Sequence, residues 1–228
     1  MDLRFYPSIE LEAMLFGICK GSISRDIQCT PDYECRGDLY IGPVGIVNLN
    51  DRNLIRSGNV FSNFMGPTYY YDREEEYVNT KEGDMISRFY ARILLNKEIR
   101  IGLDLPLILS PYEEFINRST GEVFASFKLD LFTIWADKFG EIPMPLYLAA
   151  VKNELVSGSY ILEEYIKKSI KYLHSNIDFI LREIIPNNRG IEELNLHKLS
   201  ILNFINRSSF ALKEEERASV EAIFRHLK

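Results

Sequence analysis

The segment 36–44, which reads Arg-Gly-Asp-Leu-Tyr-Ile-Gly-Pro-Val, is the feature that most constrains the fold of this chain. Its apolar run between turn residues is typical of a β-strand. Gly66-Pro67 follows, and a proline at this place favours the start of a helix. The run 92–95 is typical of another strand. This order of strand, loop, helix and strand predicts a domain that mixes strands and helices.

Other parts of the chain extend this pattern. Ser8 is expected to cap a helix, because its hydroxyl can accept a bond from the first turn. The Asn, Ser and Gly residues of 43–63 favour a long exposed loop. The elements expected in the first two thirds of the chain are a helix over 9–24, strands over 32–42, 87–101 and 122–135, and helices over 69–77 and 112–117.

The last third of the chain is expected to be helical. A heptad-like seam runs along a helix that starts near Ser159 and ends at Pro186, so this helix needs a helical partner. Residues 191–205 and 213–227 could provide it within the chain, and a coiled-coil dimer is the alternative. The residues of the seam are Ile166, Ile170, Leu173, Ile177, Ile180 and Ile184.

These elements together predict an α+β fold. Residues 1–150 would form one domain, a mixed or antiparallel sheet with packed helices. Residues 151–228 would form a C-terminal helical annex. With 228 residues, of which 46% are hydrophobic, the chain can bury a core of this size.

Composition limits the classes of partner. The chain has 27 basic and 33 acidic residues, a net charge of -6, which disfavours a nucleic-acid partner because phosphate binding needs a basic surface. No apolar run reaches the length of a membrane span. The three cysteines, Cys19, Cys29 and Cys35, include no C-x-x-C pair, so we expect neither a disulfide framework nor a zinc site, and a cytoplasmic protein.

Common catalytic motifs are absent from the sequence. It has no G-x-x-x-x-G-K-[ST] phosphate loop, no G-x-G-x-x-G and no G-x-S-x-G. The three histidines, His174, His197 and His226, lack the spacing of zinc ligands and are expected to be structural. P-loop NTPases and serine hydrolases are therefore disfavoured.

Between Ile9 and Trp135 the chain resembles class III nucleotidyl cyclases, in particular the bacterial pyrimidine-cyclase branch of anti-phage signalling. The similar motifs are Arg36-Gly37 through Gly42-Pro43-Val44, Gly66-Pro67-Thr68 and Arg92-Ile93-Leu94-Leu95. The first half of such a domain, which carries the two metal-binding aspartates, has no counterpart here. The resemblance implies a cyclase-like fold and a homodimer, because the active sites of the family lie between two subunits.

The resemblance also implies site residues. Asp2 and Asp38 would be the ligands of Mg2+ or Mn2+ if the protein is active, since no other cofactor is implied. Arg36, Tyr70 and Arg73 would contact a nucleotide. The family's phosphate-steadying Asn and Arg fall on Tyr70 and Glu74, and neither can do that work.

Two hypotheses about function follow from this resemblance. A cyclase-like domain without catalysis would bind a nucleotide or a partner protein through the loop 43–63 and the cluster 69–71. The alternative is an active cyclase that converts a nucleoside triphosphate to a cyclic mononucleotide. The missing metal-binding half favours the first hypothesis.

Overall fold

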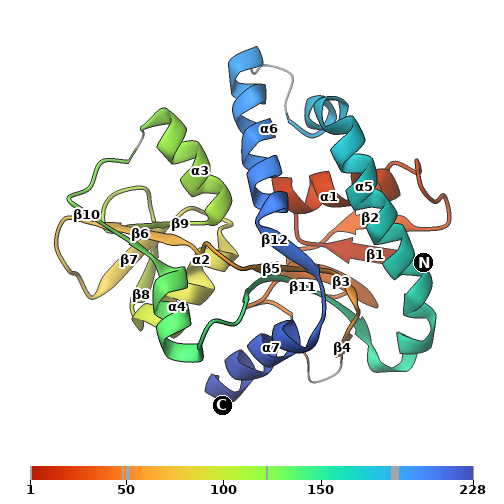
Figure 1. Cartoon of the computed structure of the whole chain (residues 1–228), viewed down its shortest axis with the longest axis horizontal. Coiled ribbons are helices and arrows are strands. Elements are labelled where there is room, and N and C mark those ends of the chain that lie inside the picture. The colour runs from red at the N-terminus through yellow and green to blue at the C-terminus, as the bar shows by residue number, and fades with distance from the viewer. Residues whose placement is uncertain (1, 48, 50–51, 122, 186–189, 228) are drawn as a thin grey trace.

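The computed structural model describes residues 2–47, 49, 52–121, 123–185 and 190–227 of the chain. They form two lobes, which lie side by side in Figure 1. Lobe one consists of the described residues within 2–62 and 144–227, and lobe two consists of those within 68–139. The chain passes from lobe one to lobe two at residues 63–67 and returns at 140–143.

Lobe one is built on a mixed sheet of seven strands among the described residues. Its central strand, β11, pairs antiparallel with β3 on one side and with β5 and β4 on the other, while β1 lies parallel between β3 and β2. The strands are β1 (Asp2–Phe5), β2 (Gln28–Pro31), β3 (Leu39–Pro43), β4 (Arg52–Leu54), β5 (Ser57–Ser62), β11 (Met144–Lys152) and β12 (Ser208–Ala211).

Lobe two is built on a smaller mixed sheet, with five strands among the described residues. β7 pairs parallel with β8 and β9, and β6 pairs antiparallel with β9 and β10. The strands are β6 (Thr68–Tyr71), β7 (Tyr77–Thr80), β8 (Glu98–Ile101), β9 (Leu107–Leu109) and β10 (Phe127–Asp130).

Helices cover both sheets, and α6 stands between the lobes in Figure 1, where it contacts α3 of lobe two and α5 of lobe one. Lobe one has α1 (Ile9–Cys19), a 3-10 turn (Asn153–Gly158), α5 (Ser159–Ile184), α6 (Ile191–Asn206) and α7 (Glu214–His226). Lobe two has α2 (Met85–Tyr90), the π-helical turn Ala91–Leu95, α3 (Pro111–Thr120) and α4 (Leu131–Phe139).

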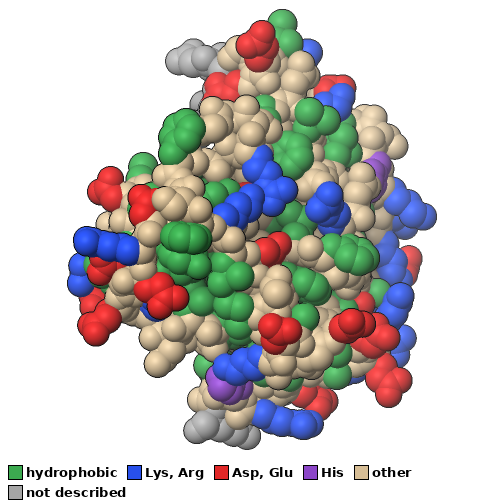
Figure 2. All heavy atoms as spheres, turned by 60° about the vertical axis from the view of Figure 1, so that its left-hand side comes forward, with side chains coloured by type: hydrophobic (Ala, Val, Ile, Leu, Met, Phe, Trp, Pro, Cys, Tyr) green, Lys and Arg blue, Asp and Glu red, His purple; other side chains and the backbone are tan. Residues whose placement is uncertain are grey.

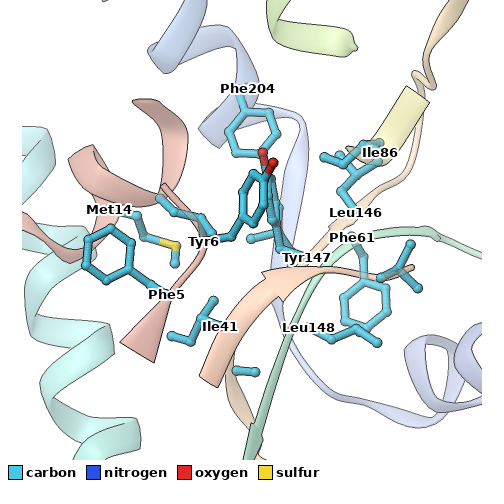
Figure 3. Packing of buried hydrophobic residues seen from close by; sticks show 14 of the residues in the cluster. Phe5, Tyr6, Met14, Ile41, Phe61, Ile86, Leu146, Tyr147, Leu148 and Phe204 are labelled. Atoms are coloured by element: carbon cyan, nitrogen blue, oxygen red, sulfur yellow. The ribbon is translucent and has the colours of Figure 1, made fainter. Parts of the chain in front are cut away.

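The core of lobe one lies between its sheet and the pair α1 and α5, and α7 also packs on β11. The helices α1 and α5 approach closely at Gly17, where an added Cβ would lie 3.1 Å from the hydroxyl oxygen of Ser169. Figure 3 shows the packing on β11, where Leu146, Tyr147 and Leu148 lie among side chains of β1, β3 and β5. Leu146 and Leu148 have no exposed surface. Burial of such side chains stabilises the sheet by about 2 kcal/mol each.

The expected α+β class, with packed helices and a helical C-terminus, is confirmed. Ser8 caps α1, and its hydroxyl accepts a bond from the backbone N of Leu11 at 3.3 Å. The expected helix over 112–117 is α3, and the C-terminal helices are α5, α6 and α7. The α5 seam packs within the chain, mainly on α1 rather than on a second helix of the annex. Pro186 lies outside the described residues.

Two local expectations about loops and helices are wrong. The expected loop 43–63 contains β5, which is buried throughout. Its polar Asn59 satisfies the backbone inside the sheet, since its amide donates to the Ile55 carbonyl and accepts from the Ala149 backbone N. Residues 69–77, expected as a helix, instead span β6 and the start of β7, because the tyrosines of β6 favour a strand.

The expected strands of lobe two are also partly helical. Asp84 accepts a bond from the backbone N of Ser87 and so caps α2, which starts at Met85 and runs into the expected strand 87–101. Only β8 of this range is a strand. Asp130 caps α4 in the same way, so the strand expected over 122–135 ends at β10. The apolar strand β11 was not expected. The expected domain boundary between residues 150 and 151 stays a prediction. Both of these residues lie within β11.

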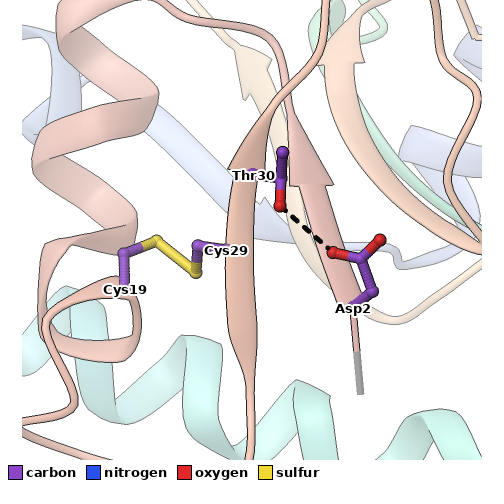
Figure 4. The surroundings of a disulfide bond; sticks show 4 residues. All are labelled: Asp2, Cys19, Cys29 and Thr30. Carbon is purple, nitrogen blue, oxygen red and sulfur yellow. Dashed lines mark hydrogen bonds between the residues drawn. A yellow bond between two sulfur atoms is a disulfide. The ribbon is translucent and has the colours of Figure 1, made fainter.

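Cys19 and Cys29 form a disulfide with Cα atoms 5.1 Å apart, so the expectation that the cysteines form none is wrong. The bond joins the end of α1 to β2, as Figure 4 shows. Cys35 is outside this bond. A spacing of ten residues between two cysteines matches no common disulfide motif. The two cysteines meet because the chain turns back between α1 and β2.

Replacing both Cys19 and Cys29 by serine should lower the free energy of unfolding by about 3 kcal/mol, because the bond closes a short loop in the unfolded chain. Urea unfolding of the double variant and of a Cys35→Ser control measures this. Alkylation of the denatured, unreduced protein should label Cys35 and leave Cys19 and Cys29 unlabelled. Labelling of all three residues would contradict the bond.

Gly66, in the crossing between the lobes, should not tolerate a side chain. An added Cβ would lie 2.7 Å from the backbone N of Phe132, and the Gly66 N itself donates to Asp130 at 2.9 Å. Gly66→Ala should therefore lower the free energy of unfolding by about 1–3 kcal/mol. Gly190→Ala is the matched control, since nothing lies within 4 Å of its added Cβ. Equal unfolding midpoints for the two variants would contradict this packing.

Candidate functional site

A cavity of about 220 Å³ lies between the two lobes, and we call it the interlobe cavity. Lobe one lines it with residues 6–10, Pro43 and Tyr147, and lobe two lines it with residues 81–86, Ser110, Tyr112 and Glu113. These segments follow the carboxyl ends of β1, β3, β7 and β9, or lie beside them. Ligand sites in α/β proteins form at this edge of a sheet, where loops rather than strands line the space.

The lobe-one wall is dominated by Glu10 in the first turn of α1. Its side chain is buried, and its carboxylate accepts a hydrogen bond from the Tyr147 hydroxyl at 3.3 Å. Burial raises the pKa of Glu10 to about 7, and the nearby Glu113 and Asp84 carboxylates raise it further, while bonds from its own backbone N and from Tyr147 oppose the shift. This carboxyl therefore keeps its proton to a much higher pH than an exposed glutamate does.

In the lobe-two wall Asp84 is the most constrained side chain. Its carboxylate accepts bonds from the Ser87 backbone N, the Ser87 hydroxyl and the Ser110 backbone N, at 3.0, 2.6 and 3.1 Å. Burial nevertheless raises its pKa. Lys81 lies beside it and forms an ion pair with Glu113 at 2.5 Å. Asp84 thus joins the starts of α2 and α3 into one rigid wall.

Hydrogen bonds cross the cleft beside the cavity and hold the lobes together. The Tyr6 hydroxyl of lobe one donates to the Gly83 carbonyl of lobe two at 2.8 Å. Tyr112 on α3 is hydrogen-bonded to His197 on α6, and the Ser200 hydroxyl donates to the Tyr112 carbonyl at 3.3 Å. These contacts keep the two walls of the cavity close together in this structure.

A wider hollow of about 780 Å³ adjoins the cavity, and we call it the outer groove. It shares Ile9, Lys81, Tyr112 and Glu113 with the cavity and continues between α3 and α6. On the α6 side it is lined by Glu192, Glu193, Leu196 and His197. The groove gives a route from solvent to the interlobe cavity along the contact between the lobes.

The residues expected to bind a metal lie on the surface of lobe one, away from the cavity. Asp2 pairs with Arg4 at 3.0 Å. It also accepts a bond from the Thr30 hydroxyl, which Figure 4 shows as a dashed line. Asp38 pairs with Lys152 at 2.8 Å, and this ammonium lowers the pKa of Asp38. The described residues contain no group of three or more side chains placed to hold a metal ion. The metal-binding role of Asp2 and Asp38 stays a prediction.

The expected nucleotide-binding residues are not brought together either. Arg36 lies on lobe one and pairs with Glu34, while Arg73 lies at the tip of lobe two and pairs with Glu75 at 2.6 Å. Tyr70 is buried in β6, where its hydroxyl donates to Glu114. None of the three lines the interlobe cavity. Their expected roles stay predictions.

The aromatic cluster 69–71 does not form the exposed surface expected of it. Tyr69 and Tyr70 are 3% and 6% exposed. Tyr71 stacks on both Tyr69 and Phe127. Hydrophobic side chains do gather on the face of lobe two that comes forward in Figure 2. Phe124 and Phe127 are the large exposed ones near β10, with 84% and 55% of their surface accessible.

Comparisons with known proteins identify the fold. No family model and no curated protein sequence matches this chain. Among solved structures, protein AF1704 from Archaeoglobus fulgidus has a TM-score of 0.74 and 12% identity over 99% of this chain and 95% of its own. The CA3427 gene product of Candida albicans, described as having the generic periplasmic binding protein fold, has a TM-score of 0.58 and 8% identity over 99% and 90%.

A ligand-binding component of an ABC-type import system from Staphylococcus aureus is similar too. It has a TM-score of 0.51 and 9% identity over 100% of this chain and 92% of its own. These likenesses cover the whole chain, including both lobes. The chain therefore has the two-lobe fold of the periplasmic binding proteins.

The resemblance to nucleotidyl cyclases is wrong, and with it both cyclase hypotheses. The likeness to structures with the periplasmic binding protein fold covers 99% or more of the chain, whereas the cyclase motifs were short and glycine-based. The segment after Gly66, which should be a helix in a cyclase, is strand β6. The prediction that no segment spans a membrane is confirmed in the described part of the chain, where no helix is both long and apolar enough to do so.

Sequence reasoning missed the residues that line the cavity. Glu10, Asp84 and Glu113 come from three separate turns, and nothing in their spacing along the chain shows that they meet. A signal was present at each turn, because a capping residue, Ser8, Asp84 or Ser110, precedes each helix that starts at the cavity. Capping marks where helices start, and it does not reveal which of those starts converge.

The buried carboxyl of Glu10 makes the stability of the protein depend on pH. Its pKa is raised from an ordinary 4.5 to about 7, so the stabilisation from the neutral form is complete below pH 4.5 and is lost as pH rises through 7. Glu10→Gln cannot ionise. It should match the wild type at pH 4.5 and exceed its free energy of unfolding at pH 8 by about 3 kcal/mol.

Urea unfolding at a series of pH values measures this difference. The matched control is Glu183→Gln on the exposed face of α5, whose stability should follow the wild type at every pH. A constant difference between Glu10→Gln and the wild type from pH 4.5 to pH 8 would show that Glu10 is not the buried titrating group.

Proposed function

We propose that this protein binds a small molecule in the interlobe cavity, with the two lobes closing around it. The observation that carries the proposal is the cavity itself, which is formed by the carboxyl ends of strands from both lobes and is lined by polar groups held in place by their neighbours. A cavity of about 220 Å³ has room for a compact ligand rather than a polymer.

The similar structures support this proposal. One of them is the ligand-binding component of an import system, and a second is described by its periplasmic-binding-protein fold. In this chain Tyr6 and Tyr112 form hydrogen bonds between the lobes beside the cavity, and opening there requires the loss of these bonds and of the nearby packing. Binding in such a cleft gains free energy from groups of both lobes at once, and this favours the closed form.

The test is a thermal-shift screen of purified protein with compounds of metabolite size, followed by calorimetry. A true ligand at 100 times its Kd should stabilise the protein by about 2.7 kcal/mol. Met85→Trp should abolish this effect, because Met85 lines the cavity and the larger ring would fill it. Ile161→Trp on the outer side of α5, where Ile161 is 43% exposed, is the matched control and should bind as the wild type does.

Two results would contradict the proposal. One is a library that stabilises no form of the protein. The other is a set of ligands that bind Met85→Trp as tightly as the wild type, since these would occupy a different site.

A further inference from the structure

We infer that the ligand of the interlobe cavity is a small organic ammonium ion, with a protonated or quaternary nitrogen on a compact apolar body. This inference rests on the proposed function and adds the chemical class of the ligand. The charges and aromatic rings of the cavity lining and the acidic side chains of the outer groove support it.

The charges that line the cavity are mostly negative. The lining includes Glu10, Glu82, Asp84 and Glu113, and Lys81 is its only lysine or arginine among the described residues. Lys81 is already paired with Glu113. The starts of α1, α2 and α3 each add up to about half a positive charge. The sum leaves an excess of about 1.5 negative charges when all the carboxyls are ionised.

The positive helix starts are already occupied by the protein itself, which argues against an anionic ligand. Ser8 accepts from the Leu11 backbone N on α1, and Ser110 accepts from the Glu113 backbone N on α3. Asp84 takes the Ser110 backbone N. An anion would have to displace these acceptors and would also come close to the Glu10 carboxylate. The contacts that it could form would therefore not offset the free-energy cost of removing it from water.

Glu10 is placed to neutralise a cation. The groups that face it are Tyr147 from β11, Asp84 from the turn before α2 and Glu113 from α3, and none of them is cationic. A buried carboxylate without a cationic partner costs free energy, which is why its pKa is raised. A bound ammonium would supply the missing charge in a site of low dielectric, where the attraction is much stronger than in water.

Aromatic rings provide the remaining surface that such a ligand needs. Tyr6, Tyr112 and Tyr147 all line the cavity. In Figure 3 the hydroxyl ends of Tyr6 and Tyr147 point the same way, away from Ile41 and Leu148 of the sheet. The faces of such rings attract cations, and carboxylates combined with aromatic rings recognise organic ammonium groups.

The outer groove favours the approach of a cation. Glu192 and Glu193 on α6 add to Glu113 along this route, and Lys81 remains the only lysine or arginine of its described lining. A cleft lined by one sign of charge raises the local concentration of the opposite ion. The outer groove and the interlobe cavity therefore both favour a positively charged ligand.

The test uses calorimetry at constant ionic strength to compare ligands that share a phenyl ring and carry a positive, a neutral or a negative group. The cationic probes are benzylamine and benzyltrimethylammonium, the neutral probe is benzyl alcohol and the anionic probe is benzoate. The cations should bind the wild type, and Glu10→Gln should weaken them at least tenfold. Glu183→Gln is the matched control and should leave every Kd unchanged.

The pH dependence gives a second readout. The pKa of Glu10 in the free protein is about 7, so lowering the pH from 8 to 5.5 should weaken the cations about 30-fold in the wild type. Glu10→Gln should show a much smaller change. The quaternary probe cannot lose a proton, so the titration of the ligand does not affect this comparison.

The outcomes separate this inference from the proposed function. If benzoate or benzyl alcohol binds as tightly as benzylamine and Met85→Trp abolishes that binding, the ammonium inference is wrong and the cavity remains a ligand site. Unchanged binding of the cations by Glu10→Gln also overturns the inference. If neither these probes nor any compound of the wider library binds in a way that Met85→Trp abolishes, both proposals fail.

Discussion

The position of β11 at the centre of the lobe-one sheet is the constraint on which the rest of the structure depends. This strand returns from lobe two and pairs at once with β3 and β5, so it fixes where both crossings leave and enter the sheet. Its pairing with β5 is completed by Asn59, whose side chain bonds the backbone of β11 at Ala149. A buried ladder of this kind sets where lobe two is attached to lobe one.

The interlobe cavity lies at the edge of this sheet, and forming it lowers the stability of the protein. The parallel strands of both sheets point their carboxyl ends at the cleft, and the capped helices that follow bring acidic side chains with them. Acidic residues in the first turn stabilise a helix. The same position buries the Glu10 carboxyl away from water. Glu10 therefore stabilises the start of α1, but its ionised form costs free energy in the cavity. Residues that are costly in the free protein are typical of binding sites.

The sequence predicted the helices better than the sheets, and the reason is physical. The start of α1 at Ser8 and the long apolar stripe of α5 depend on contacts within a few residues, so they could be predicted. β5 and β11 depend on partners far away in the chain. Asn59 appears as a turn residue in the sequence and serves as a buried backbone partner in the sheet. The cavity could not be predicted for the same reason, because Glu10 and Asp84 meet only after two sheets have formed.

The crossings have a further consequence for the architecture. Ser62 at the end of β5 is paired with Met144 at the start of β11, so these strands form an antiparallel hairpin whose connection is all of lobe two. Lobe two is thus an insertion at a hairpin turn. A short turn in place of residues 67–140 would leave every strand of the larger sheet with its hydrogen-bonded neighbours, so evolution could add or remove lobe two without changing the strand order of lobe one.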